Sequence, residues 1–167
     1  MKIRKIRVIS VPDPKHTDNV DWAGDRRKFN NMELLHHEIT DKVIGIFFQV
    51  YNELGFGFLE RVYQNAMYLE LKAQGFQCET EKNIKVYYKN MLVGDYRADI
   101  IVDGKIIIEL KASQALAYEN ELQLINYLKA TEIEVGLLLN FGQKPEFKRK
   151  VFTNENKKHR FTGENNG

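Results

Sequence analysis

The sequence feature that most constrains the fold is the dipeptide Asp103-Gly104, which stands between two runs of β-branched apolar residues. An Asp-Gly pair in this setting is among the strongest short-range signals for a β-hairpin. The two runs, residues 100–102 and 106–108, show no clean alternation of apolar and polar residues, which is typical of strands buried on both faces. We therefore predict a buried hairpin near the centre of a sheet.

Three charged residues interrupt this hairpin: Asp99, Glu109 and Lys111. Burying an unpaired charge costs several kcal/mol, so such residues pair with one another, bind a metal or face a cleft. Because side chains alternate between the two faces of a strand, Glu109 and Lys111 share one face. Spacing alone leaves two interpretations open, namely a metal-binding catalytic set or a buried network of ion pairs.

The register of the hairpin decides whether Asp99 joins the other two charges. With a strict two-residue turn, Asp99 falls opposite Ile108 and its side chain lies on the wrong face. A three-residue loop with Gly104 in the left-handed region instead brings Asp99 opposite Glu109. The functional interpretation therefore requires the three-residue loop or a bulge.

Two carboxylates and a lysine on one face form a set with a definite chemistry. Carboxylate oxygens suit a hard divalent cation such as Mg²⁺. A metal held there activates water and neutralises charge on a phosphodiester, while the ammonium group orients the water or stabilises the transition state. The set predicts hydrolysis of a phosphate ester if the three side chains meet.

Length and composition are those of one globular domain, since the chain has 167 residues, of which 43% are hydrophobic and 29% charged. No apolar run approaches the roughly 18 residues of a membrane span, and no apolar signal region follows the basic N-terminus. The single cysteine, Cys78, excludes an internal disulfide and fits a reducing compartment. We expect a cytoplasmic protein that does not enter a membrane.

The net charge of +2 is unevenly distributed along the chain. Residues 1–31 and 144–167 hold more Lys and Arg than Asp and Glu, whereas residues 32–143 hold more acids than bases. Basic ends around an acidic centre suit a polyanion such as nucleic acid, although charged termini are often merely solvated. We divide the chain into an N-terminal arm at 1–31, a compact domain at 32–152 and a polar tail at 153–167.

Within the compact domain, hydrophobic periodicity predicts helices at 33–54, 59–74 and 118–130. Besides the central hairpin, strands are predicted at 77–81, 84–88, 92–96 and 134–140, with a basic edge strand at 147–152. This order of helices and strands predicts an α/β domain with a mixed central sheet flanked by helices.

Four sequence motifs, in the order in which they occur along the chain, resemble those of the GxxExxY family, a RecB-like branch of the PD-(D/E)XK nuclease superfamily. The family's name motif stands at residues 57–63, with Glu60 as its acid, and the nuclease signature stands as Asp99 followed by residues 109–111. Residues 123–127 resemble the Gln-x-x-x-Tyr motif, and residues 139–142 also fit this branch. The resemblance covers residues 33–152 and implies an αβββαβ nuclease core.

The resemblance also implies roles for individual residues. Asp99 and Glu109 would bind Mg²⁺ or Mn²⁺, with the carbonyl group of Leu110 and the carboxylate of Glu60 as further ligands. Lys111 would orient or activate the attacking water.

A helix following the signature would complete the site. Gln123 and Tyr127 lie four residues apart, so they project from one face of the predicted helix. The resemblance implies that Gln123 positions Lys111 or the water, and that Tyr127 contacts the phosphate of the substrate. Tyr63, the last residue of the name motif, is expected in the core behind the site.

The predicted function is that of a metal-dependent nuclease that hydrolyses DNA, or alternatively RNA. The competing hypothesis is a catalytically silent nuclease-like module that binds nucleic acid or a protein partner. A homodimer is compatible with the nuclease hypothesis, because cutting both strands of a duplex benefits from two sites.

Overall fold

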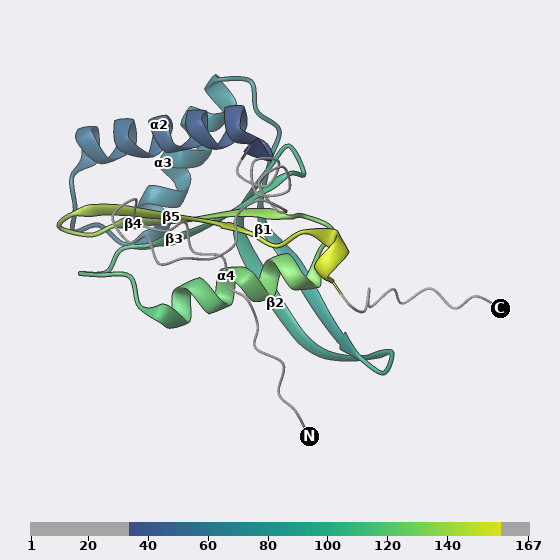
Figure 1. Ribbon diagram of the computed structural model, residues 1–167. Helices are drawn as coiled ribbons and strands as arrows, with labels where there is room; N and C mark the ends of the chain where they lie inside the picture. Colours follow the sequence, from purple (N-terminus) through teal and green to yellow (C-terminus); the bar gives the residue numbers. More distant parts are fainter. Residues whose placement is uncertain (1–33, 158–167) are drawn as a thin grey trace, which may run out of the picture.

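The computed structural model describes residues 34–157, so the predicted arm at 1–31 and residues 158–167 of the predicted tail lie outside the described part (Figure 1). The elements, in chain order, are α2 (His37–Leu54), α3 (Glu60–Ala73), β1 (Cys78–Tyr88), β2 (Met91–Val102), β3 (Ile106–Lys111), α4 (Tyr118–Ala130), β4 (Val135–Phe141), β5 (Pro145–Val151) and the short 3-10 helix η1 (Asn154–Asn156). Among these residues, no helix combines the length and apolar character that crossing a membrane requires.

The five strands form one mixed sheet in the order β1-β2-β3-β4-β5. All neighbouring pairs are antiparallel except β3 and β4, which run parallel and are joined by α4 as a crossover helix. A parallel pair needs such a crossover, and it places α4 against one face of the sheet. The α/β fold with a mixed central sheet is therefore confirmed, and β5 is the edge strand that the sequence predicts.

Helices cover both faces of the sheet, with α2 and α3 on one face and α4 on the other (Figure 1). The apolar faces of both helices, with Phe47 on α2 and Tyr63 and Met67 on α3, pack against the sheet. They contact the even-numbered residues of β3 and the odd-numbered residues of β4. Leu124 and Leu128 of α4 pack against Ile107 and neighbouring residues on the opposite face. The strands are apolar on both faces because both faces are covered.

The central hairpin has the three-residue loop on which the functional interpretation depends. Val102 pairs with Ile106, so three residues connect the strands. Asp103 and Gly104 both have left-handed backbones, with φ of 51° and 64°. The Asp103 carboxylate accepts a hydrogen bond of 2.8 Å from the Gln77 amide, which holds the loop against the start of β1. The predicted register is confirmed.

The neighbouring hairpin, β1 and β2, differs from the prediction in its length. The segments predicted as separate strands at 77–81 and 84–88 form one strand, although Glu81 at their junction has a φ of 52°. Likewise, β2 is continuous from its start to the central hairpin. The turn predicted at Lys89-Asn90 is confirmed. Since β3 pairs only with the last residues of β2, the outer half of this hairpin projects beyond the sheet (Figure 1).

Candidate active site

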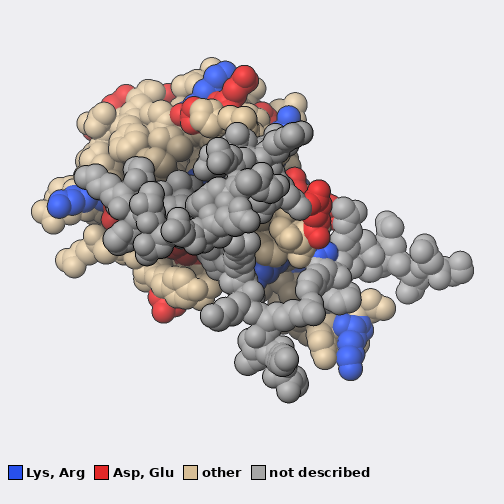
Figure 2. All heavy atoms as spheres, viewed as in Figure 1, with Lys and Arg blue, Asp and Glu red and all other residues tan. Residues whose placement is uncertain are grey.

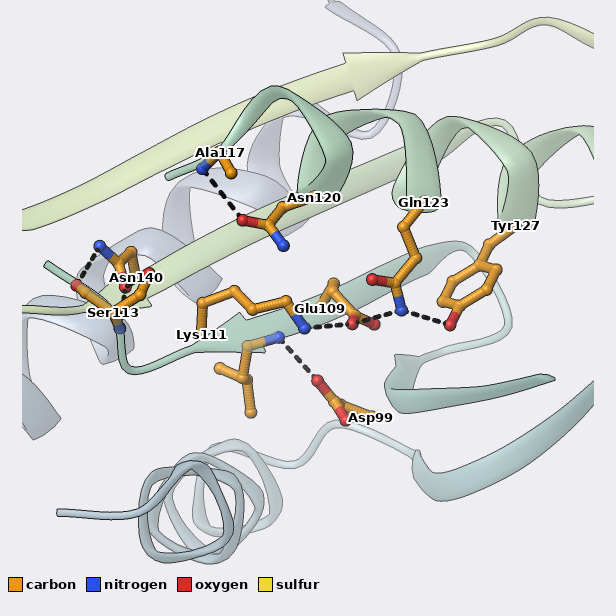
Figure 3. A network of polar contacts seen from close by, with 10 residues as sticks. Asp99, Glu109, Lys111, Ser113, Ala117, Asn120, Gln123, Tyr127 and Asn140 are labelled. Carbon is orange, nitrogen blue, oxygen red and sulfur yellow. Dashed lines mark hydrogen bonds and ion pairs between the residues drawn. The ribbon is translucent and has the colours of Figure 1, made fainter. Parts of the chain in front are cut away.

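A polar network joins β3 to α4 at the carboxyl end of β3 (Figure 3). Its centre is Glu109, whose side chain is only 3% exposed. Lys111 Nζ lies 2.7 Å from Glu109 Oε1, and Gln123 Nε2 donates to the same oxygen at 2.9 Å. Gln123 Nε2 also lies 2.6 Å from the hydroxyl oxygen of Tyr127. Four of the residues singled out in the sequence thus form one connected network.

Asp99 reaches the network from β2, where the pairing between β2 and β3 ends. The last paired residues are Ile100 and Ile108, and extending this register by one position places Asp99 opposite Glu109. Beyond that point the carboxylate of Asp99 accepts a hydrogen bond of 2.7 Å from the amide of Leu110. A side-chain oxygen therefore satisfies a backbone donor at the point where the two strands separate.

The sequence interpretation missed Gln64, a residue that holds the backbone of Asp99 from α3. Gln64 is buried, and its Nε2 donates to the carbonyl oxygen of Asp99 at 2.9 Å. Glu60 lies four residues earlier and therefore on the same face of the helix. This spacing gives Gln64 a place on the helix face of Glu60, but nothing local in the sequence shows that its side chain binds the backbone of Asp99. Glu60 itself is exposed at the first turn of α3.

Tyr63 explains why the motif has its particular spacing. Its hydroxyl donates to the carbonyl oxygen of Gly55 at 2.9 Å and accepts from the amide of Phe58 at 3.2 Å. The ring is fully buried and stacks on Phe141, with centroids 4.2 Å apart. Gly57, with a φ of 105°, allows the loop between these contacts to turn. Tyr63 thus lies in the core, as expected, and holds in place the loop that leads into α3.

Burial and mutual repulsion disturb the ionisation of the two central carboxyl groups. Burial, together with the negative charge of Asp99, raises the pKa of Glu109 to about 7. The hydrogen bond from Lys111 acts in the opposite direction but is the weaker effect. Burial also raises the pKa of Asp99. Burial alone would lower the pKa of Lys111, but its hydrogen bond to Glu109 and the surrounding negative charges raise it. The nearby cations, Lys111 and for Asp99 also Arg61, therefore do not fully offset the burial and mutual repulsion of the two carboxyl groups.

The donor groups at this site fit a divalent cation. Glu109 Oε2 is buried and has no hydrogen-bond partner among residues 34–157, so one oxygen of this carboxylate is left to bind another group. An electrostatic interaction with Asp99 places a second carboxylate nearby, and Glu60 acts on both. Within residues 34–157, no three Asp, Glu, His or Cys side chains already surround a common point. A cation here would therefore also use backbone oxygen or water, as Mg²⁺ usually does.

The motif at 139–142 fixes the segment that follows Lys111. Asn140 is fully buried and pairs with both backbone groups of Ser113, since its Oδ1 accepts from the amide and its Nδ2 donates to the carbonyl, each at 3.0 Å. Gly142 allows the close approach of the chains, because a Cβ atom there would lie 2.1 Å from the carbonyl oxygen of Ser113. The motif thus anchors the connection between Lys111 and Gln123.

Comparison with known proteins identifies the superfamily of the chain. Residues 37–150 match the family model described as the PD-(D/E)XK nuclease superfamily. The chain belongs to this superfamily, and all the residues of the polar network fall within the match.

Other comparisons provide less detail. No curated protein matches the chain significantly. Among solved structures, the crystal structure of SSO0001 is similar, with 22% sequence identity and a TM-score of 0.45 over 76% of this chain. The match spans 62% of the length of that protein.

Proposed function

We propose that the chain is a metal-dependent nuclease of the GxxExxY, RecB-like branch, which hydrolyses phosphodiester bonds of DNA. One observation carries the proposal: Asp99, Glu109 and Lys111 converge at one end of β3, and in the described part of the chain one buried oxygen of Glu109 has no hydrogen-bond partner. A purely structural ion-pair network would be expected to satisfy both oxygens of a buried carboxylate. Membership of the nuclease superfamily supports the same proposal.

The residues that would hold Mg²⁺ or Mn²⁺ are Asp99, Glu109, the carbonyl group of Leu110 and Glu60. When bound, the metal supplies charge neutralisation on the phosphate and lowers the pKa of an attacking water. The hydrogen bond from the Leu110 amide to Asp99 supports this set, because it fixes the peptide that carries one ligand next to the side chain that carries another. Glu60 has the least constrained position, since it is exposed.

Lys111 is proposed to orient the attacking water and to stabilise negative charge on the phosphate. Its raised pKa keeps the ammonium group protonated at neutral pH, so it acts as a donor. Gln123 donates to the same oxygen of Glu109 as Lys111 and thereby positions both groups. Tyr127 is held by Gln123 at the far end of the polar network from Lys111, and it is proposed to contact the phosphate of the substrate.

The decisive experiment is cleavage of labelled single- and double-stranded DNA and RNA in the presence of Mg²⁺ or Mn²⁺. The variants Glu109→Gln and Lys111→Ala are expected to lose at least 100-fold in rate, the order expected for removing a metal ligand or a transition-state donor. Glu38→Gln, which removes an exposed carboxylate on α2, is the matched control and should cleave normally. Cleavage that persists in Glu109→Gln would contradict the proposal.

The same experiment separates the proposal from a silent binding module. Such a module would bind nucleic acid or a protein partner with no metal-dependent turnover on any substrate. Comparing the four nucleic acids also decides whether DNA is the preferred substrate. Sedimentation at the assay concentration would show whether the active species is a homodimer.

A further inference from the structure

A groove continues from the candidate active site along α4. It has a volume of about 730 Å³ and lies between α4 and the outer half of the hairpin β1–β2. Gln123 and Tyr127, which belong to the polar network, also line the groove. The hairpin wall is made by residues of both strands, among them Tyr96. The groove and the site therefore share two side chains and form one continuous surface.

One aromatic ring of this groove, that of Tyr96, is accessible to solvent, and the ring of Tyr127 beside it is buried. Tyr96 is 51% exposed, and its ring centroid lies 6.0 Å from that of Tyr127, with the planes inclined at 47°. Gly94 leaves room for the Tyr96 ring, because a Cβ atom at Gly94 would lie 2.8 Å from Tyr96 Cε2. An exposed ring held next to an enclosed apolar space is a surface on which a planar group can stack.

Basic residues accompany the rings on both walls. Lys85 lies on the hairpin wall and Lys129 on the helix wall. Lys111 does not line the groove and belongs to the neighbouring polar network. Glu119 and Glu132 also line the groove, so its charge is mixed. Figure 2 shows further Lys or Arg side chains at the outer end of the hairpin, on the face presented there. The Lys129 ammonium group lies 5.6 Å from the centroid of the Phe152 ring. Lysines on both walls of a groove suit a ligand with a charged backbone and planar groups.

The dimensions of the groove select among nucleic acids. Its volume falls within the range of sites that enclose small ligands, about 300–1,000 Å³. Space of this size between a helix and a hairpin admits individual unpaired bases, whereas a base-paired duplex would have to remain outside. Stacking on aromatic side chains combined with lysine contacts is the usual means of binding single strands.

We infer that the groove between α4 and the β1–β2 hairpin binds unpaired nucleotides next to the phosphate to be cleaved, with a base stacked on Tyr96. The inference rests on the proposed function and extends it, because it assigns single-stranded nucleic acid, or a single-stranded end or flap, as the substrate class. Tyr96 would then determine specificity without taking part in the chemistry.

The test is the dissociation constant of a fluorescein-labelled oligothymidylate strand and of a blunt duplex, measured by anisotropy in EDTA so that no hydrolysis occurs. Wild type should bind the single strand more tightly than the duplex. Tyr96→Ala should weaken single-strand binding about 5- to 150-fold, the effect of losing one stacked base. Tyr96→Phe should bind as wild type does. Tyr88→Ala, which removes a 59% exposed tyrosine of the same hairpin that does not line the groove, should have no effect.

A second variant, Gly94→Ala, acts on the same ring without removing it. The new methyl group would displace the Tyr96 ring, so this variant should also weaken single-strand binding. Unchanged binding in both Tyr96→Ala and Gly94→Ala, or tighter binding of the duplex by wild type, would overturn the inference. Circular dichroism of each variant checks that the fold is retained.

Cleavage assays keep this inference distinguishable from the proposed function. If metal-dependent cleavage is lost in Glu109→Gln but binding does not depend on Tyr96, the proposed function stands and the groove inference fails. If binding depends on Tyr96 but no substrate is cleaved with either metal, the groove is a binding site for single strands, and the proposed function fails together with the assignment of a substrate.

Discussion

The two faces of the sheet differ in how their side chains change along β3 and β4. On the face toward α2 and α3, both strands are apolar throughout. On the face toward α4, β3 changes from Ile107 to Glu109 and Lys111, and β4 changes from Leu138 to Asn140. The polar residues thus gather at the carboxyl ends of the only parallel pair in the sheet.

This difference separates stability from function within one small domain. A face that is apolar along its whole length provides the core, and the other face has a core only at one end. Ligand sites in sheets with parallel strands commonly lie at the carboxyl ends of those strands. We therefore expect substitutions on the α2/α3 face to act on folding and substitutions at the polar end of the α4 face to act on charge and activity.

The largest effect is expected for Phe47→Ala on the α2/α3 face. Phe47 is fully buried, and its ring packs edge-on against Phe141 with centroids 4.8 Å apart. Removing a buried phenylalanine leaves a cavity and costs about 3–5 kcal/mol. Urea unfolding should show a loss of this size, a large part of a typical total stability of about 5–15 kcal/mol.

Phe48→Ala is the control, because Phe48 lies next to Phe47 on the same helix but is 36% exposed. It should cost clearly less. Equal losses for the two variants would show that the α2/α3 face is not the close-packed core described above.

A smaller effect is expected for Glu109→Gln, and it depends on pH. The pKa of Glu109 is about 7 in the folded protein against an ordinary value of 4.5, so the folded state binds more protons between these values. The stability of the metal-free wild type should therefore fall as pH rises from 4.5 to 7, by up to about 3 kcal/mol from this group. Glu109→Gln should lose most of this slope in urea unfolding measured in EDTA.

The matched control for that slope is Glu38→Gln, which removes an exposed carboxylate from α2. It should retain the wild-type slope. Mg²⁺ should raise the melting temperature of wild type more at pH 8 than at pH 5.5, because the metal requires the deprotonated carboxylate. If the stability of wild type and of Glu109→Gln depended on pH in the same way, the raised pKa could not be attributed to Glu109.

Much of the fold is readable from the sequence, for local reasons. The register of the central hairpin follows from Asp103-Gly104 together with the requirement that Asp99 and Glu109 meet. The helix at 118–130 has the predicted bounds, because its apolar stripe is regular. The hairpin β1–β2 was predicted in pieces, since the alternation of its residues is interrupted near Glu81 and its outer half has no core to face.

The residues of the polar network could be predicted from the sequence, but the residues that hold the backbone around them could not. Glu109, Lys111, Gln123 and Tyr127 could be grouped because strand and helix periodicity places them on shared faces. Gln64 and the partners of Asn140 could not, because their hydrogen bonds go to backbone atoms of distant segments. Whether a polar side chain binds a backbone atom elsewhere depends on the tertiary fold and leaves no local pattern.

A further prediction concerns the support of the polar end of the α4 face. Asn140→Ala would leave the amide and the carbonyl of Ser113 without their present partners. The expected cost is about 1–3 kcal/mol, in the lower part of this range if water replaces the side chain. If the proposed function is correct, cleavage should also slow, because the segment between Lys111 and Gln123 would lose its anchor.

The control is Ser113→Ala, which keeps both backbone hydrogen bonds and removes the hydroxyl group. This group lies 3.4 Å from Asn140 Oδ1 and donates an exposed hydrogen bond of 2.9 Å to the carbonyl oxygen of Ala115. The loss should be about 0.5–1 kcal/mol and smaller than that of Asn140→Ala, because no buried backbone group loses its partner. A loss as large as that of Asn140→Ala would place the effect on the hydroxyl and contradict the proposed anchor.

The smallest effect is expected at the edge of the same face, where two lysines of β5 bind one acid of α4. Lys150 and Lys148 both pair with Glu121, but their side chains are 4% and 49% exposed. Lys148→Ala should cost at most about 1 kcal/mol, because exposed ion pairs contribute little. Lys150→Ala should cost more, because it removes buried contacts as well as a partially buried pair. Urea unfolding of both variants measures the difference, and high salt should reduce the Lys148 effect. Equal losses would mean that burial does not distinguish the contributions of the two pairs to stability.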